Sequence, residues 1–146
     1  VLKNSLIDSD LSRFTNSLSI LRSSNISIIN ALEISADTIS NSYLRQQVKS
    51  TANKVAEGES LASSLEKIQV IPPLVTQMIE NGERSGRLEE MLEKVSVYLE
   101  DKFQSSTKIT MNLLEPLIVV FLGMFVALIV LAILLPLIQL NTLTLN

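Results

Sequence analysis

Cysteine, histidine and tryptophan are absent from the 146-residue sequence. Without cysteine, the chain can form no disulfide bond, no cysteine-based zinc site and no thiolate nucleophile. Without histidine, it has no Ser-His-Asp triad, no imidazole ligand for a metal and no imidazole pH switch. The composition therefore excludes disulfide scaffolds, zinc ribbons and triad hydrolases.

Positive charge is also scarce. The chain carries 12 Lys and Arg against 15 Asp and Glu, which gives a net charge of −3 at pH 7. A nucleic-acid-binding protein needs clustered cations to neutralise phosphates, so this balance argues against nucleic acid as a partner. The charges are unevenly distributed, because every ionisable side chain lies at or before Glu115 and residues 116–146 contain none.

A long apolar run fills this uncharged part of the sequence. Residues 117–135 read LIVVFLGMFVALIVLAILL, and apolar residues continue to Leu140. About 20 helical residues cross a hydrocarbon core of about 30 Å. The run therefore predicts a transmembrane helix. The alternative, a core helix of a larger soluble protein, rarely needs so long an unbroken apolar stretch, and the position of the run excludes a signal peptide.

The residues that flank the run predict its orientation. Lys102 and Lys108 precede it, whereas the last six residues, NTLTLN, carry no charge. Positive residues stay on the cytoplasmic side of a span. We therefore expect residues 1–115 in the cytoplasm and the tail across the membrane. The first residue is Val1 rather than Met, which favours a piece of a longer protein.

The part before the span predicts helices and no sheet. No stretch shows sustained alternation of apolar and polar residues with a β-branched bias. Its glycines and prolines are few and mark the expected breaks: Gly58, Pro72, Pro73, Gly82 and Gly86. We expect an all-α fold, in which a six-helix cytoplasmic bundle is followed by a C-terminal transmembrane helix.

Cap residues divide the first half of this bundle. Asp10 is expected to cap the first helix, and the second helix is expected to open near Ser27. The Ser-Asn-Ser cluster at residues 40–42 is expected to end the second helix and cap the third. The third helix is expected to stop at Gly58, because glycine suits a left-handed C-terminal position.

The second half begins with Ser60, which is expected to cap a short fourth helix. Pro72-Pro73 is expected to start a fifth helix, since proline fits the first turn, and this helix is expected to end at Asn81-Gly82. A sixth helix is expected after Gly86. Nothing interrupts it before Pro116, so we expect it to bend there and continue into the membrane.

The segment NGERSGR at residues 81–87 contains two glycines four residues apart. A phosphate-binding loop of the Walker A type needs Gly-Lys-Ser/Thr after its second glycine, and Gly86 is followed by Arg87-Leu88. The segment is therefore interpreted as a tight turn in which Gly82 and Gly86 supply backbone freedom. Glu83 is expected to cap the following helix or to pair with Arg84 or Arg87.

Acidic residues cluster at four places. Paired carboxylates can bind Ca²⁺ or Mg²⁺, but they more often form a solvated helix face or complement a helix N-terminus. No pocket signature surrounds them, so acid–base catalysis is not favoured. The clusters are Asp8/Asp10, Glu57/Glu59, Glu89/Glu90/Glu93 and Glu100/Asp101.

The boundary of the span carries Glu115 directly before Pro116. Two interpretations stay open: a polar contact that orients the span toward a partner, or a last cytoplasmic charge with an ordinary kink. Within the span, Gly123 and Ala127 have the spacing that permits close helix packing. Pro136 is expected to mark the end of the helix or a second bend.

Taken in order, these pieces resemble the GspF family, the inner-membrane platform protein of the type II secretion system, which includes the platform protein of type IV pilus assembly. The resemblance covers residues 12–143. Its most characteristic elements are Gly-Glu-x-x-Gly, at Gly82, Glu83 and Gly86, and Glu115-Pro116 before the span. The further matching segments are Arg13-Phe14, residues 28–36, 44–65 and 78–92, Pro72-Pro73-Leu74 and residues 114–140.

One turn departs from the family pattern. Residues 24–27, Ser-Asn-Ile-Ser, replace a turn that commonly contains glycine and proline. Asn25 tolerates a left-handed backbone better than most residues, so the turn can persist. Family members carry two copies of the helical module and three spans. The resemblance therefore implies the second copy at residues 1–110, the last span at 111–140 and a short periplasmic tail at 141–146.

The resemblance implies a non-enzymatic function without a cofactor or metal. It implies a platform that couples a cytoplasmic secretion ATPase to pseudopilus assembly and protein export. The implied partners are this ATPase, other inner-membrane components, pseudopilins, the lipid bilayer and further copies of the chain. Type IV pilus assembly is the alternative within the family. A generic tail-anchored adaptor and a membrane-anchored enzyme or transporter fragment are the alternatives outside it.

Overall fold

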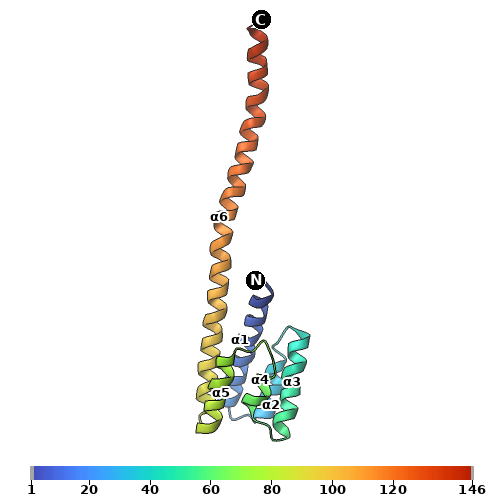
Figure 1. Cartoon of the computed structure of the whole chain (residues 1–146), viewed down its shortest axis with the longest axis vertical. Coiled ribbons are helices and arrows are strands. Elements are labelled where there is room, and N and C mark those ends of the chain that lie inside the picture. Colours follow the sequence, from blue (N-terminus) through green and yellow to red (C-terminus); the bar gives the residue numbers. More distant parts are fainter. Residues whose placement is uncertain (1, 146) are drawn as a thin grey trace. The chain divides into compact units, whose positions relative to one another are not determined.

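The computed structural model describes residues 2–145, and all regular structure in that range is helical (Figure 1). This confirms an all-α fold with six helices. As expected, the last helix of the bundle continues into the apolar run, and the two form one helix. The six helices are α1 (Leu2–Ser23), α2 (Ile28–Ala36), α3 (Ser42–Ala56), α4 (Leu61–Glu66), α5 (Pro73–Ser85) and α6 (Leu88–Thr144).

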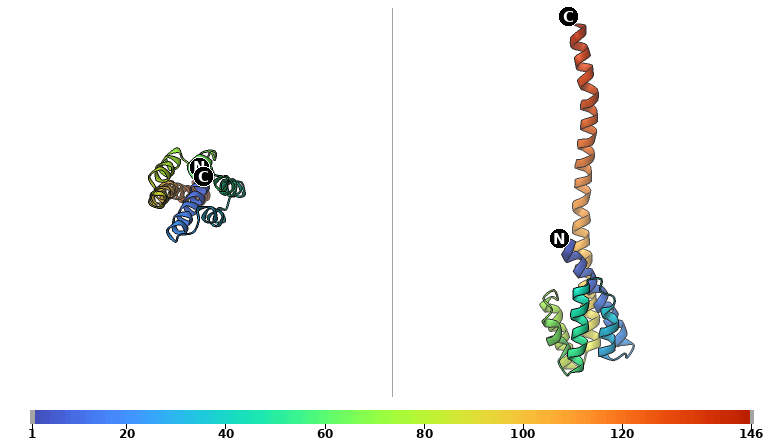
Figure 2. Two further views of the ribbon diagram at one scale, coloured as in Figure 1. Left: turned by 90° about the horizontal axis from the view of Figure 1, so that it is seen from below. Right: turned by 90° about the vertical axis from the view of Figure 1, so that its right-hand side faces the viewer.

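The chain divides into two compact units, Val1–Ser106 and Thr107–Asn146. In the first unit, α2 packs against α1 and α3, α3 packs against α4, and α4 packs against α5. The end-on view in Figure 2 shows these helices and the beginning of α6 arranged around a common centre. Helix α6 contributes residues to both units.

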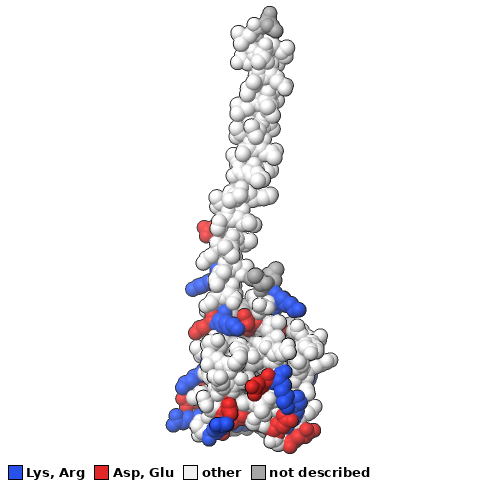
Figure 3. Space-filling model, viewed as in Figure 1, with Lys and Arg blue, Asp and Glu red and all other residues white. Residues whose placement is uncertain are grey.

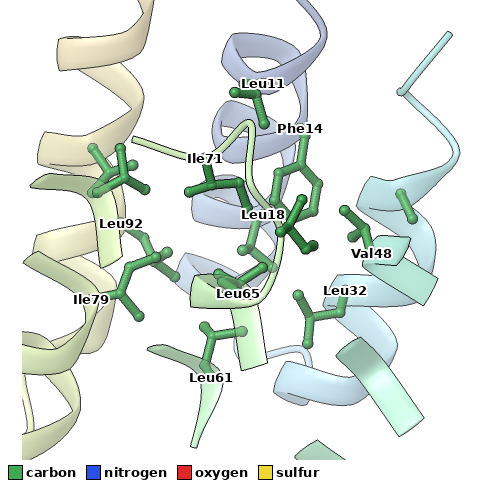
Figure 4. Close-up of a cluster of buried hydrophobic side chains, with 14 of the residues drawn as sticks. Leu11, Phe14, Leu18, Leu32, Val48, Leu61, Leu65, Ile71, Ile79 and Leu92 are labelled. Carbon is green, nitrogen blue, oxygen red and sulfur yellow. The ribbon is translucent and has the colours of Figure 1, made fainter. Parts of the chain in front are cut away.

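Apolar side chains from all six helices form the core of the first unit (Figure 4). On α1 they recur at the i, i+3 and i+4 spacing that places them along one face, from Leu11 through Phe14 to Leu18. Burial of such side chains stabilises each by about 1.5–3 kcal/mol. The largest fully buried side chains are Phe14, Leu11, Leu18, Leu32, Ile39, Leu61, Leu65, Ile79, Leu92, Leu99, Val48 and Val75.

The expected helix starts at Ser27, Asn41, Ser60 and Pro73 are confirmed. The Asn41 side chain accepts a hydrogen bond from the Leu44 N–H at 3.0 Å. The Ser60 hydroxyl accepts one from the Ser63 N–H at 3.1 Å, and Ser27 caps α2 in the same way. Each cap satisfies an N–H that has no partner inside its own helix.

Left-handed backbone occurs where the sequence supplies Asn or Gly. Asn25 has φ 62°, so the turn that departs from the family pattern persists without glycine. Gly58 has φ 103°, as expected for the residue that stops α3. Gly86 has φ 69° and ends α5. The prediction that α5 ends at Gly82 is wrong, because the helix continues to Ser85.

The prediction that Asp10 caps the first helix is also wrong. Helix α1 begins at Leu2, and Asp10 lies in its interior with only 3% of its surface exposed. The apolar face of α1 extends before Asp10, because Ile7 precedes Leu11 by one turn and packs against the core. A buried interior carboxylate needs partners from another segment, and these are described below.

Gly82 is where α5 and α6 approach each other closely. It is buried, and its backbone is helical rather than left-handed. A Cβ atom added there would lie 2.9 Å from Met91 Cβ and 3.1 Å from Leu88 Cα. Both distances are shorter than an ordinary contact between carbon atoms. Glycine is therefore required at this position because a side chain would not fit. The sequence had suggested a different reason, the backbone freedom of glycine in a turn.

The second unit consists of the rest of α6. By length and composition this helix is able to cross a membrane, and its apolar part carries no charged residue (Figure 3). Pro116 and Pro136 both lie inside the helix. Pro136 does not mark its end, because the helix continues to Thr144. A proline is tolerated in a spanning helix when neighbouring groups satisfy the freed carbonyl.

We expect Gly82→Ala to destabilise the first unit. Alanine favours helix over glycine by about 1 kcal/mol, so propensity alone would stabilise α5. The clash with Met91 and with the backbone at Leu88 opposes this, and overpacking costs about 1–3 kcal/mol. Urea unfolding of the chain in detergent, followed by circular dichroism, measures the difference. Ser85→Ala, at an exposed position one turn later, is the control, and a Gly82→Ala variant more stable than wild type would contradict the close approach.

Candidate functional site

Glu83, within the Gly-Glu-x-x-Gly element on α5, connects that helix to the start of α4. Its Oε1 accepts a hydrogen bond from the Leu61 N–H at 2.6 Å, and its Oε2 accepts one from the Ala62 N–H at 3.2 Å. These are the first two residues of α4. The carboxylate thus satisfies two N–H groups that have no partner within α4, and its negative charge complements the helix N-terminus. Glu83 caps an earlier helix in the sequence, not the following one as expected.

The two glycines of the element have different roles around Glu83. Gly82 lets α5 lie against α6, and Gly86 ends α5 in the left-handed conformation. Because residues up to Ser85 are helical, the segment is not a glycine-rich loop that cradles a phosphate. The turn interpretation is right for Gly86 and wrong for Gly82. Arg84 pairs with Glu80 at 2.7 Å rather than with Glu83.

Asp10 makes an equivalent connection from α1. Its Oδ1 accepts a hydrogen bond from the Ser40 N–H at 3.0 Å, and its Oδ2 accepts one from the Asn41 N–H at 2.9 Å. Arg13 donates a third at 2.7 Å. Burial raises the pKa of Asp10, but the backbone hydrogen bonds from Asn41 and Ser40 and the side-chain bond from Arg13 outweigh it, so the pKa lies below its usual value.

Ion pairs connect α1 with the first part of α6. Arg22 pairs with Glu89 near the start of α6, and Lys102 lies 3.6 Å from Asp8 near the other end of the first unit. The hydrogen bond from its own N–H is the largest cause that lowers the pKa of Glu89, and the bond from Arg22 is the next. These contacts fix α1 along α6, but each is partly exposed and contributes little stability alone.

The predicted site residues lie at three places. Gly82, Glu83 and Gly86 lie together at the end of α5, and Gly58 lies in the turn before α4, whose N-terminus Glu83 caps. Pro72 and Pro73 form the start of α5. The residues of the second unit, Glu115, Pro116 and Pro136, lie within α6, and Glu115 is exposed.

The carboxylates do not gather into a metal site in the part of the chain that the structure describes. Among residues 2–145, no group of three or more acidic side chains is placed to hold a metal ion. Asp10 and Glu83 direct both oxygens at backbone N–H groups, and Glu59 pairs with Lys67 at 3.1 Å. Asp10 and Glu83 therefore act as hydrogen-bond acceptors that join helices, and Glu59 belongs to a surface ion pair.

Sequence reasoning missed the segments that these carboxylates bind. The N–H groups of Leu61 and Ala62, and those of Ser40 and Asn41, belong to helix starts that were correctly predicted. The acceptors lie 21 to 31 residues away in sequence. One pattern in the sequence does indicate the position of Asp10. Apolar residues recur at helical spacing from Ile7 to Leu11 and beyond, so Asp10 lies inside a helix and not at its start.

We expect Glu83→Leu to lower the free energy of unfolding by about 1–3 kcal/mol, because it leaves two N–H groups at the start of α4 without acceptors. Glu83→Gln keeps one acceptor and is expected to fall between Leu and wild type. Glu80→Gln, on the same helix in an exposed ion pair, is the control and is expected to change stability by less than about 1 kcal/mol. Urea unfolding measures all three, and equal effects at positions 80 and 83 would contradict the capping role.

Asp10→Asn is expected to destabilise the fold in a pH-dependent way. Since the pKa of Asp10 is lower in the folded than in the unfolded chain, its contribution is complete above the unfolded value of 3.8 and is lost as pH falls through the folded value. At pH 7 we expect a loss of roughly 1.5–3 kcal/mol, which shrinks below about pH 4. Asp37→Asn is the control, because Asp37 is an exposed partner of Lys49. A pH-independent difference would contradict this assignment.

Comparison with known proteins places these features in a family. Residues 14–136 match the family described as type II secretion system (T2SS), protein F. The chain is 41% identical over 134 residues to the type II secretion system protein F of Pseudomonas aeruginosa, and 35% identical over 131 residues to that of Vibrio cholerae. It is 34% identical over 128 residues to the type IV pilus assembly protein PilC of Thermus thermophilus.

These alignments cover 92%, 90% and 87% of the chain, but only 33%, 32% and 32% of the respective relatives. The chain therefore spans about a third of the length of the curated relatives it matches. The matched range includes Glu83, Glu115 and Pro116, whereas Asp10 lies before it. The chain belongs to the type II secretion system protein F family, which is related to the type IV pilus protein PilC.

Proposed function

We propose that the chain is the second helical module and the last membrane span of an inner-membrane platform protein of the type II secretion system. The observation that carries this proposal is the family match over residues 14–136. The 41% identity to a type II secretion relative, against 34% to a PilC relative, favours secretion over pilus assembly. Type IV pilus assembly is the second candidate.

The distribution of charged and apolar residues along the sequence supports a proposed arrangement in the membrane. Residues 1–110 form the cytoplasmic module, residues 111–140 form the span, and residues 141–146 form the periplasmic tail. Lys102 and Lys108 before the apolar run, and the absence of charge after it, support this orientation. Among the described residues 2–145, helix α6 is long and apolar enough to cross a membrane, which supports the span.

The proposed mechanism is mechanical and involves no catalysis by this chain. A cytoplasmic assembly ATPase is proposed to bind the helical module and to drive a displacement of it. Helix α6 runs from Leu88 to Thr144 and loses backbone hydrogen bonds only at Pro116 and Pro136, so a displacement can be passed along it. Pseudopilins and other inner-membrane components are the proposed recipients, and further copies of the chain are proposed to complete the platform.

The carboxylates Asp10 and Glu83 support this role because a module that transmits force must keep its helices together. Each joins two segments that are distant in sequence through two backbone hydrogen bonds. Glu115, by contrast, is exposed on the helix at the start of the apolar run. It is proposed to make a polar contact with a partner at the membrane boundary.

Copurification of the chain with the secretion ATPase tests the proposal. We expect Glu115→Gln to reduce secretion while the fold stays intact, because this variant removes a charge that faces outward. Glu83→Gln is expected to reduce both secretion and ATPase binding through a loosened module. Glu80→Gln, at an exposed carboxylate on α5, is the control for charge loss alone. The readouts are secreted protein per cell and ATPase retained on the purified chain.

If Glu115→Gln and Glu83→Gln both leave secretion and ATPase binding unchanged, the proposed functional residues are wrong. If the chain binds a pilus ATPase and restores pilus assembly rather than secretion, the second candidate replaces the first. The two outcomes are separate, because one concerns the residues and the other concerns the machine.

A further inference from the structure

A groove of about 550 Å³ lies on the first unit, and none of the described residues that line it is acidic. The groove is formed by the first turns of α1, the start of α3 and the link between α4 and α5, which Figure 1 shows at one end of the unit. Lys3 and Lys67 line it together with Tyr43 and Val70. Lys67 pairs with Glu59 at 3.1 Å, so among the described residues the unpaired positive charge of the groove comes from Lys3.

The groove offers both charge and apolar surface. Tyr43 is 71% exposed and Val70 is 41% exposed, although both are large apolar side chains. Lys67 pairs with Glu59, and among the described residues 2–145 no carboxylate pairs with Lys3. Apolar residues exposed beside unpaired charge are typical of an interaction surface whose partner carries carboxylates around an apolar contact.

A complementary surface lies on the outward face of α6 within the same unit. Glu93, Val97, Glu100 and Gln104 recur at the i, i+4, i+7 and i+11 spacing of one helix face, and Asp101 lies beside them. Val97 is 54% exposed. Within the described part of the chain, none of the three acidic residues forms an ion pair. We call these five residues the acidic α6 face.

The neighbouring cations leave this face negative. Lys94, at its edge, pairs with Glu90 at 3.0 Å. Lys102, on the next turn, lies 3.6 Å from Asp8 of α1. Both lysines are therefore held by other carboxylates. The acidic α6 face thus carries carboxylates and a central apolar side chain. These complement the positive charge and the exposed apolar side chains of the groove.

We propose that the groove of one copy of the chain binds the acidic α6 face of a second copy. The two surfaces differ, so the contact is heterologous, and such a contact forms a ring when the rotation between neighbouring copies closes. All copies inserted in one membrane share an orientation, which is compatible with a rotation axis normal to the membrane. The inference deepens the proposed self-association and rests on the proposed function only for the presence of several copies in one membrane.

The absence of cysteine allows a direct test by disulfide crosslinking. Gln69→Cys places a thiol in the groove, and Gln104→Cys places one on the acidic α6 face, without removing a charge or an apolar contact. The two single-cysteine chains, with tags of different length, are inserted together in vesicles of bacterial phospholipid and oxidised. We expect the mixed dimer to exceed both same-site dimers. Gln46→Cys, on an exposed position of α3 outside the groove, replaces Gln69→Cys in the control.

Charge reversal tests the electrostatic part of the contact. Lys3→Glu on the chain that carries Gln69→Cys is expected to lower the mixed dimer about two- to fivefold, the range for an exposed ion pair. Glu100→Lys on the chain that carries Gln104→Cys is expected to restore it. Rescue by the second reversal cannot arise from misfolding of the first variant.

Three outcomes would overturn the proposal. The first is a mixed dimer no more abundant with Gln69→Cys than with Gln46→Cys. The second is a predominant Gln104→Cys homodimer, which would indicate a symmetric contact between α6 helices. The third is protection of Gln69→Cys from a maleimide reagent without any crosslink, which would indicate that lipid or another part of the chain covers the groove. Each readout is independent of the ATPase, so failure here leaves the proposed platform function separately testable.

Discussion

Backbone N–H groups at helix starts are the constraint on which the first unit depends. Six helices in about a hundred residues expose many such groups, and a buried helix end without acceptors is costly. Asp10 and Glu83 each supply two carboxylate oxygens to a helix start that lies far away in sequence. These bonds both satisfy the backbone and fix which helices are neighbours, because a carboxylate on the wrong helix would leave the N–H groups unpaired.

Close packing supports the same arrangement. The capped α4 adjoins α5, and α5 approaches α6 at Gly82 with no room for a Cβ atom. The residue that permits this approach and the residue that caps α4 are adjacent in sequence, followed three residues later by the glycine that ends the helix. The Gly-Glu-x-x-Gly element therefore has a structural explanation in each of its fixed positions: space, an acceptor and a left-handed turn.

Local signals predicted the elements well, and long-range contacts escaped them. Ser27, Asn41, Ser60 and Pro73 mark helix starts because each acts on N–H groups within its own turn, which a sequence shows directly. Asp10 resembled a cap by residue type, but its partners lie across the fold, and only tertiary structure shows them. Gly82 resembled a turn residue for the same reason, because the space it must leave belongs to another helix.

The uncharged end of α6 has a consequence for the energetics of the membrane. A charge that crosses a potential of 100 mV changes its energy by about 2.3 kcal/mol. Residues 116–146 contain no ionisable side chain, so sliding or rotating this part of the helix moves no side-chain charge through the electric field. In the proposed arrangement, the side chains of the span therefore do not couple such a movement to the membrane potential.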